Sequence, residues 1–285
     1  MEQAMAELPL AIFTTLAPLG AGAFIALAVA FFTTKFSDEQ LKKIDAMTSI
    51  PLIVLIVGFI ASFIHLASPL NAFNVFVGVG TSPLSNEIVM GIVFVVVAIA
   101  YWALAFAGKL GLGARKIFAA IVAVLAIVFA IFVGMAYVIP TIASWNTPLV
   151  PVQILGFALL GGMCLGTLVL ALAGVLEDAK RTGFKTVSLV LVAVGAILAI
   201  AALFMQLNMA SAVENALCIG AALTALMMPY AIGFAVCALV AAVLEGVVLL
   251  KQNSLAIVIV AVACSAVGIF LARLVFYGIQ ISVGL

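Results

Sequence analysis

The chain has 285 residues, of which 68% are hydrophobic and only 7% are charged. This composition excludes an ordinary soluble domain, because its apolar fraction is far above that of soluble proteins. The formal net charge is +1, so the charge balance predicts no nucleic-acid partner. We therefore expect a protein that lies in the lipid bilayer.

Eight apolar runs are long enough to cross a bilayer as helices, which takes about 20 residues each. In chain order they cover residues 9–33, 47–66, 87–107, 117–138, 152–176, 186–205, 226–250 and 255–277. The sequence thus predicts an all-α integral membrane fold with eight transmembrane helices, forming a single polytopic membrane domain over residues 1–285. Glu2 and Glu7 precede the first run, where a cleavable signal peptide would carry basic residues.

Basic residues occur in only four of the connections between these runs. They are Lys35, Lys42 and Lys43; Lys109, Arg115 and Lys116; Lys180, Arg181 and Lys185; and Lys251. By the positive-inside rule these four loops face the cytoplasm. We therefore expect a multi-pass protein of the cytoplasmic membrane with both the N- and C-termini on the outer side.

The first and fifth runs share a pattern. Three residue types recur at the same offset: Pro9 and Pro151, Ile12 and Ile154, and Gly20 and Gly162. One interpretation is a parallel repeat of two halves, which would give two packed four-helix bundles. The other is ordinary helix packing, which also explains the GxxxG formed by Gly162 and Gly166.

The few titratable groups near the predicted outer surface form a candidate site. His65, the only histidine, ends the second run, and Glu87 opens the third. Arg273 lies about one helical turn below the outer end of the eighth run. Tyr277 follows it at i+4, hence on the same helix face. Ionisable groups within a membrane are rare and often functional, so these residues are candidates for binding and proton transfer.

Each candidate also has an explanation without function. His65 and Tyr277 are typical interfacial residues, and Glu87 suits a helix N-terminus. Arg273 could extend its side chain to the surface. Glu245, near the cytoplasmic end of the seventh run, fits either such an interfacial position or a proton relay.

The uncharged stretch between the second and third runs holds Asn71 and Asn74 as further hydrogen-bonding groups. We expect this segment to fold back onto the outer surface and to roof a pocket open to the bilayer. Oxidation of a lipid-soluble quinol suits such a site, because imidazole accepts a proton near neutral pH. The electrons need a carrier in a partner subunit, because one histidine and scattered cysteines provide neither a bis-histidine haem nor an iron–sulfur cluster.

Several segments carry a resemblance to a known family. The stretch HLASPLNAFNVFVGVGTSPLSNEI (65–88) and the end ARLVFYGIQISVGL (272–285) resemble the membrane-anchor subunits of dimethyl sulfoxide reductase and its relatives. The segment SWNTPL with the glycine-rich run after it (144–166), and LAGV (172–175), are similar too. The resemblance covers essentially the whole chain, and the 65–88 block is its specific part.

The resemblance implies an anchor without a covalent or metal-bound cofactor of its own. Its partners would be an electron-transfer subunit with four-iron iron–sulfur clusters and a molybdopterin catalytic subunit. Menaquinol would be oxidised near the outer face, with His65 and Glu87 at the family's quinol-site positions. Asn71 departs from the family pattern, where a basic residue is usual, and so does Gln280, where a histidine can occur.

A small-solute transporter is the alternative function. The possible repeat and Glu245 are its only support in the sequence. Transporters usually place polar or broken segments near the membrane midplane. Here the polar groups gather at one surface, which favours the quinol-oxidising anchor.

Overall fold

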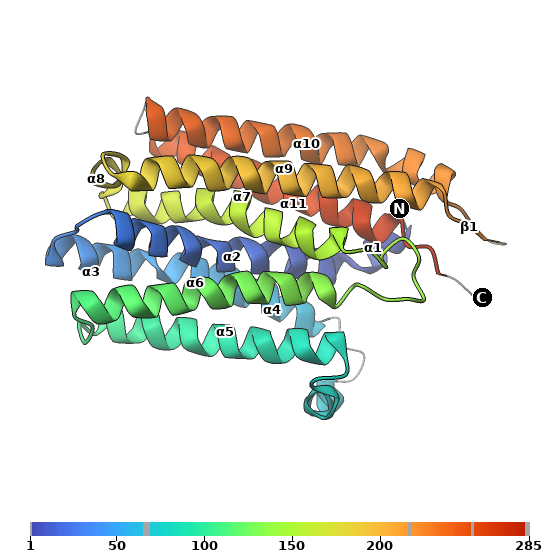
Figure 1. The fold of residues 1–285 in the computed structure, drawn as a ribbon, viewed down its shortest axis with the longest axis horizontal. Helices are drawn as coiled ribbons and strands as arrows, with labels where there is room; N and C mark the ends of the chain where they lie inside the picture. Colours follow the sequence, from blue (N-terminus) through green and yellow to red (C-terminus); the bar gives the residue numbers. More distant parts are fainter. Residues whose placement is uncertain (1, 65–68, 216–217, 252–253, 283–285) are drawn as a thin grey trace.

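A computed structural model describes residues 2–64, 69–215, 218–251 and 254–282. Within these ranges the chain folds into α-helices, one 3-10 helix and a hairpin of two very short strands (Figure 1). The elements are α1 (Glu2–Ala6), α2 (Leu8–Thr33), α3 (Asp38–Met47), α4 (Ser49–Ile64), η1 (Pro69–Gly78), α5 (Pro83–Phe106), α6 (Leu112–Met135), α7 (Leu149–Leu172), α8 (Leu176–Lys180), α9 (Gly183–Ser211), β1 (Glu214–Asn215), β2 (Cys218–Ile219), α10 (Gly220–Leu250) and α11 (Leu255–Gly278).

Eight segments in the described part of the chain are long and apolar enough to cross a membrane, which confirms the predicted count. They are α2, α3 together with α4, α5, α6, α7, α9, α10 and α11. The second span differs most from its prediction, since it begins at Asp38. Ser37 starts it with a capping box: its hydroxyl accepts from the Gln40 N–H, and the Gln40 side chain accepts from the Ser37 N–H.

Helices α2 and α7 form the centre of the bundle. In each, 83% of the most apolar window is buried, against 28–44% in the other six spans. Glycines let them approach: a Cβ on Gly22 would lie 1.9 Å from the Ala158 carbonyl oxygen, and one on Gly162 would lie 2.3 Å from Gly22. Larger side chains would push the helices apart, so these small residues hold the centre together.

The other six spans pack around this central pair, and their arrangement is similar in the two halves of the chain. In the first half, α4 and α6 pack on α2, and α5 packs on α6. In the second half, α9 and α11 pack on α7, and α10 packs on α9 and α11. The last helix of each half also contacts the first helix of the other half, α6 with α7 and α11 with α2. A division into two four-helix bundles stays a prediction, because α2 packs on α7 as closely as on the helices of its own half.

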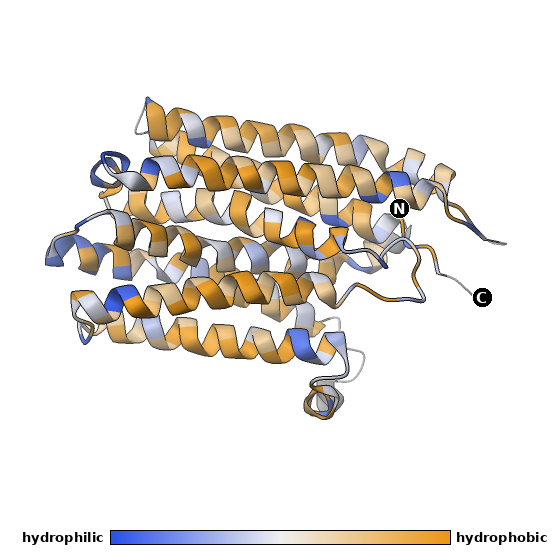
Figure 2. Cartoon of the chain, viewed as in Figure 1, coloured by the Kyte–Doolittle hydropathy of each residue, from blue (hydrophilic) through white to orange (hydrophobic). Residues whose placement is uncertain are grey.

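The two ends of the bundle differ in polarity. Helices α3 and α8 lie at one end, and α1 and the β1–β2 hairpin lie at the other (Figure 1). Hydrophilic residues gather around α3 and α8, whereas the middle of the helices is apolar (Figure 2). We call the end with the lysine-bearing connections the basic end and the end with both termini the terminal end.

The 3-10 helix η1 does not cover the bundle as predicted. It packs mainly on the start of α5 and projects from the edge of the terminal end (Figure 1). Phe73, Phe76 and Val77 are exposed on it, with 78%, 53% and 88% of their surface accessible. The described part of this segment is therefore an apolar projection beside α5 and not a roof over the middle of the bundle.

Candidate functional site

A fully buried arginine marks the terminal end. Arg273 lies on α11 with none of its surface exposed, so it does not extend to the surface. Its Nε donates a hydrogen bond to the Thr14 hydroxyl on α2 over 2.8 Å. Thr14 donates in turn to the Leu10 carbonyl oxygen over 2.7 Å. The guanidinium is thereby held at the contact between the first and the last span.

Aromatic rings surround this guanidinium. Its Cζ lies 3.9 Å from the centre of the Phe276 ring, 4.9 Å from that of Tyr277 and 5.1 Å from that of Tyr137. Such contacts place the negative face of each ring against the cation and stabilise it where water is absent. We call Tyr137, Phe276 and Tyr277 the aromatic cage.

Hydrogen bonds and stacking fix the cage. The hydroxyls of Tyr277 and Tyr137 share a 2.7 Å hydrogen bond, so Tyr277 is a buried residue and not part of an interfacial belt. Trp145 stacks on Phe276 with ring centres 4.6 Å apart, and its Nε1 donates to the Phe276 carbonyl oxygen. The connection between α6 and α7, which carries Tyr137 and Trp145, is tied to the end of the chain by a bridge between Ile142 and Ser282.

The cage leaves two donors of Arg273 unused. Neither Nη1 nor Nη2 has a hydrogen-bond partner in the described part of the chain. A buried unpaired donor costs about 1–3 kcal/mol, and more when it is charged. A ligand oxygen at these nitrogens would remove that cost, so the guanidinium is suited to bind a polar ligand atom.

Glu87 supplies a carboxyl group near this site. It lies on α5, with 5% of its surface exposed, and the charge of Arg273 acts on it over a distance longer than a direct ion pair. Burial raises the pKa of Tyr137 well above its usual value, and the charges of Tyr277 and Glu87 add to this while Arg273 opposes it. Glu87 is not a helix cap, because Ser82 caps α5 by accepting from the Ser85 N–H.

A shallow apolar groove lies on the two helices that carry Thr14 and Arg273, and Arg273 itself is not among its lining residues. It has a volume of about 250 Å³ and runs between α2 and α11, one turn deeper in the bundle. Its lining residues are Ile12, Thr15, Leu16, Ala266, Val267 and Phe270. Because these side chains are almost entirely apolar, the groove suits a hydrocarbon ligand.

The structure thus gathers part of the predicted site. Arg273 and Tyr277 are in contact, and Glu87 lies within electrostatic range of both the arginine and Tyr137. Asn74 is exposed on η1. His65 lies outside the described residues, as does the side chain of Asn71.

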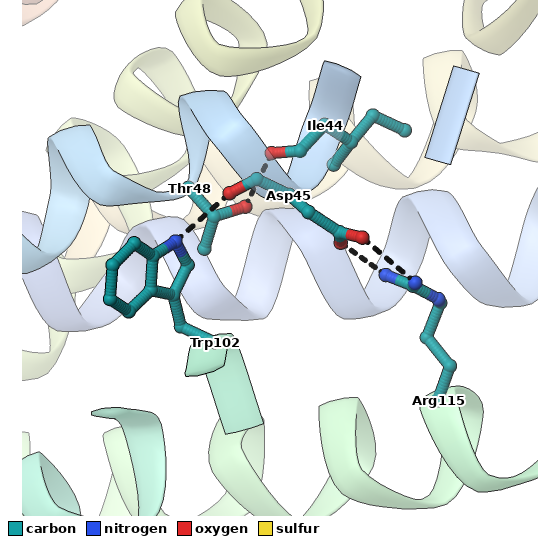
Figure 3. Close-up of polar contacts among 5 residues, drawn as sticks. All are labelled: Ile44, Asp45, Thr48, Trp102 and Arg115. Carbon is teal, nitrogen blue, oxygen red and sulfur yellow. Dashed lines mark hydrogen bonds and ion pairs between the residues drawn. The ribbon is translucent and has the colours of Figure 1, made fainter. Parts of the chain in front are cut away.

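Residues at the basic end that the sequence did not single out form a buried ion pair. Both Nη atoms of Arg115 on α6 donate to the two carboxylate oxygens of Asp45 on α3 (Figure 3). Trp102 Nε1 donates to the Asp45 carbonyl oxygen over 3.0 Å, which adds α5 to the contact. One feature of the sequence could have predicted this ion pair. Arg115 lies in the first turn of its helix, where the helix dipole disfavours a cation unless an acidic residue compensates its charge.

Glu245 is fully buried, so its side chain does not extend to the surface. It lies on α10 and accepts a hydrogen bond from the Thr167 hydroxyl on α7. Its second carboxyl oxygen has no partner in the described part of the chain. Among the described residues, no three His, Cys, Asp or Glu side chains gather as metal ligands.

The fold and the cage define a multi-pass helical membrane protein with a polar, aromatic-lined site buried at one end of its bundle. The model of the family "DMSO reductase anchor subunit (DmsC)" matches residues 1–279, and the chain belongs to this family. The chain is 31% identical to the C subunit of anaerobic dimethyl sulfoxide reductase of Escherichia coli (strain K12), over 98% of this chain and 96% of the relative. It is 28% identical to the corresponding subunit of Haemophilus influenzae, over its full length and 99% of that relative.

A third relative matches a shorter part of the chain. The YnfH subunit of anaerobic dimethyl sulfoxide reductase of Escherichia coli (strain K12) is 32% identical over 195 residues, which are 68% of this chain and 66% of the relative. These relatives confirm the family that the sequence segments indicated. They leave the role of each site residue to be tested.

Proposed function

We propose that the chain anchors a molybdoenzyme complex in the cytoplasmic membrane and oxidises menaquinol at its terminal end. The main supporting observation is the buried guanidinium of Arg273, which has two unpaired nitrogens and an aromatic cage, with an apolar groove on the same two helices. A quinol has the matching properties: an apolar ring and tail with two polar oxygens. Family membership supports the anchor role and disfavours the transporter alternative.

The partners follow from the electron balance. Oxidation of a quinol to a quinone releases two protons and two electrons. The electrons pass to an iron–sulfur subunit with four-iron clusters, as the family resemblance implies. That subunit delivers them to a molybdopterin catalytic subunit, and the relatives' printed names support a reductase of this kind.

Each site residue has a proposed part in the reaction. Arg273 Nη1 and Nη2 donate to one quinol oxygen and stabilise the negative charge that develops on it as its proton leaves. Glu87, which lies within electrostatic range of Arg273, relays protons or orients His65. His65 accepts a proton at the other oxygen, as the family resemblance implies, and Tyr277, Asn71 and Asn74 support the site.

The terminal end faces outward in this proposal. All four connections with lysine or arginine lie at the basic end, which the positive-inside rule assigns to the cytoplasm. Both termini then lie outside, and the protons of the quinol are released there. The iron–sulfur partner docks on the same outer side.

The test is menaquinol oxidation by membranes that contain the native complex. We expect His65→Ala and Glu87→Gln to lose most of the turnover while the iron-containing partners still co-purify with the anchor. Glu214→Gln is the matched control for Glu87→Gln, because Glu214 is an exposed acid at the same end. Unchanged turnover in both site variants would refute the quinol site, and purification without iron-containing partners would refute the anchor role.

A further inference from the structure

A second cavity lies at the basic end, far from the aromatic cage along the bundle. It has a volume of about 510 Å³ and lies between the end of α2, the start of α6 and α3. Lys35 and Lys116 give it a cationic side, and Phe31, Phe36 and Leu112 give it an apolar side. Arg115 also lines it, with its charge balanced by Asp45. The described residues that line it include no acid. A ligand that fits must therefore be both anionic and amphiphilic.

The start of α6 strengthens the positive side. Gly111 occupies the N-cap position and makes no side-chain cap, so the first backbone N–H groups of the helix have no capping acceptor on that residue. Gly113 lines the cavity, and a Cβ added to it or to Gly111 would meet no described atom within 4 Å. Helix N-termini of this kind attract phosphate through their N–H groups and the helix dipole.

A buried donor gives an independent sign of a ligand. Arg115 is 4% exposed, and its two Nη atoms are occupied by Asp45. Its Nε is buried and has no hydrogen-bond partner in the described part of the chain. The ion pair therefore fixes the guanidinium at the cavity wall and leaves one donor that a ligand oxygen could satisfy.

The position of the cavity selects a membrane ligand. Leu112 and the neighbouring Phe32 are 58% and 57% exposed, so apolar side chains border it on the side of the lipid. Lys116 Nζ lies 5.8 Å from the centre of the Phe32 ring, so a cationic group of the cavity adjoins this exposed apolar residue. A free phosphate ion would gain nothing from these apolar walls.

We propose that this cavity binds the phosphate headgroup of an anionic phospholipid at the basic end of the bundle. Lys35, Lys116 and the α6 N-terminus hold the phosphate, and Arg115 Nε donates to one of its oxygens. The acyl chains lie along the exposed apolar residues. This inference does not depend on quinol oxidation at the other end.

The test is native mass spectrometry of the purified protein with its partners, in detergent with added phosphatidylglycerol or phosphatidylcholine. We expect selective retention of phosphatidylglycerol by the wild type. A Lys35→Gln/Lys116→Gln double variant should lose it on the order of tenfold, since each lysine near an anionic headgroup contributes severalfold. Lys109→Gln/Lys251→Gln is the control, with the same loss of charge at exposed lysines that do not line the cavity.

A second pair of variants tests the cavity without removing a lysine. Gly113→Glu places a carboxylate at the open helix start and should abolish phosphatidylglycerol retention, whereas Gly113→Gln, which has the same shape, should keep most of it. Equal retention in the double variant and its control would overturn the proposal. Displacement of the lipid by millimolar inorganic phosphate would show a plain anion site and overturn the lipid assignment.

Discussion

The chain buries two arginines, one at each end of the bundle, and equips them differently. Arg115 is neutralised by Asp45, which accepts from both of its Nη atoms. Arg273 touches no carboxylate of the described residues and makes one hydrogen bond among them, to the Thr14 hydroxyl, within an aromatic cage. Both are at most 4% exposed. The two arginines thus differ in their interaction partners and not in their burial.

This comparison separates two uses of a buried charge. A guanidinium paired with a carboxylate has its charge balanced, and it joins helices that hydropathy alone would not orient. A buried guanidinium with two unpaired nitrogens still lacks hydrogen-bond acceptors, and a ligand can supply them. Arg115 is therefore held in an ion pair that leaves its Nε unpaired among the described residues, whereas both Nη atoms of Arg273 are unpaired there.

Breaking the ion pair should have the largest effect. Asp45→Asn leaves the Arg115 guanidinium buried without its carboxylate, and loss of one partner of a buried pair costs about 3–5 kcal/mol. We expect a clear drop in the thermal unfolding temperature of the purified complex. Asp38→Asn, an exposed acid on the same helix, is the control and should shift it little. Equal shifts in the two variants would mean that the pair contributes no more than a surface charge.

Neutralising the other arginine should affect turnover more than stability. Arg273→Gln removes the proposed quinol ligand, and loss of such a charge-stabilising group lowers turnover roughly a hundredfold. It leaves the Asp45–Arg115 ion pair intact, so the unfolding temperature should fall less than in Asp45→Asn. Arg273→Lys keeps the charge without the planar fork, and its turnover should fall between those of Arg273→Gln and the wild type. Full quinol turnover in Arg273→Gln would refute the proposal that Arg273 binds the quinol.

The hydroxyl pair of the cage should have a smaller effect. Tyr277→Phe leaves the buried Tyr137 hydroxyl without its 2.7 Å partner, which costs about 1–3 kcal/mol. Tyr137→Phe should cost a similar amount, and the double variant should cost much less than the sum of the two. A double-mutant cycle on unfolding free energies measures this coupling. Simple additivity would show that the two hydroxyls do not support each other.

The smallest effect concerns the hydrogen bond that orients Arg273. Thr14→Val keeps the shape of the side chain but removes the acceptor of Nε, worth about 1 kcal/mol, or roughly a fivefold loss of quinol turnover. Thr33→Val is the matched control, because the Thr33 hydroxyl on the same helix donates to the Val29 carbonyl oxygen and lies away from Arg273. A loss of turnover in Thr33→Val as large as in Thr14→Val would point to a general disturbance of α2.

Several features were predictable because they depend on depth in the membrane. Run length and hydropathy predicted the eight spans. Arg273 and Tyr277 were paired correctly because i and i+4 residues share one helix face. The position of a residue within a spanning helix gives its depth, because each helical residue adds a fixed rise along the helix axis.

Contacts between side chains on different helices could not be predicted from the sequence. Nothing in the sequence links Arg273 to Thr14, 259 positions away, or Tyr277 to Tyr137, 140 positions away. The Asp45–Arg115 pair and the burial of Glu245 also depend on which helix faces meet.

The sequence by itself determined the class of fold, the spans and the family, because these follow from composition and local pattern. Only the tertiary structure decided which buried charges are paired and which await a ligand. Those contacts depend on which helices pack together, α3 with α6, α7 with α10 and α2 with α11, and hydropathy carries no information about that.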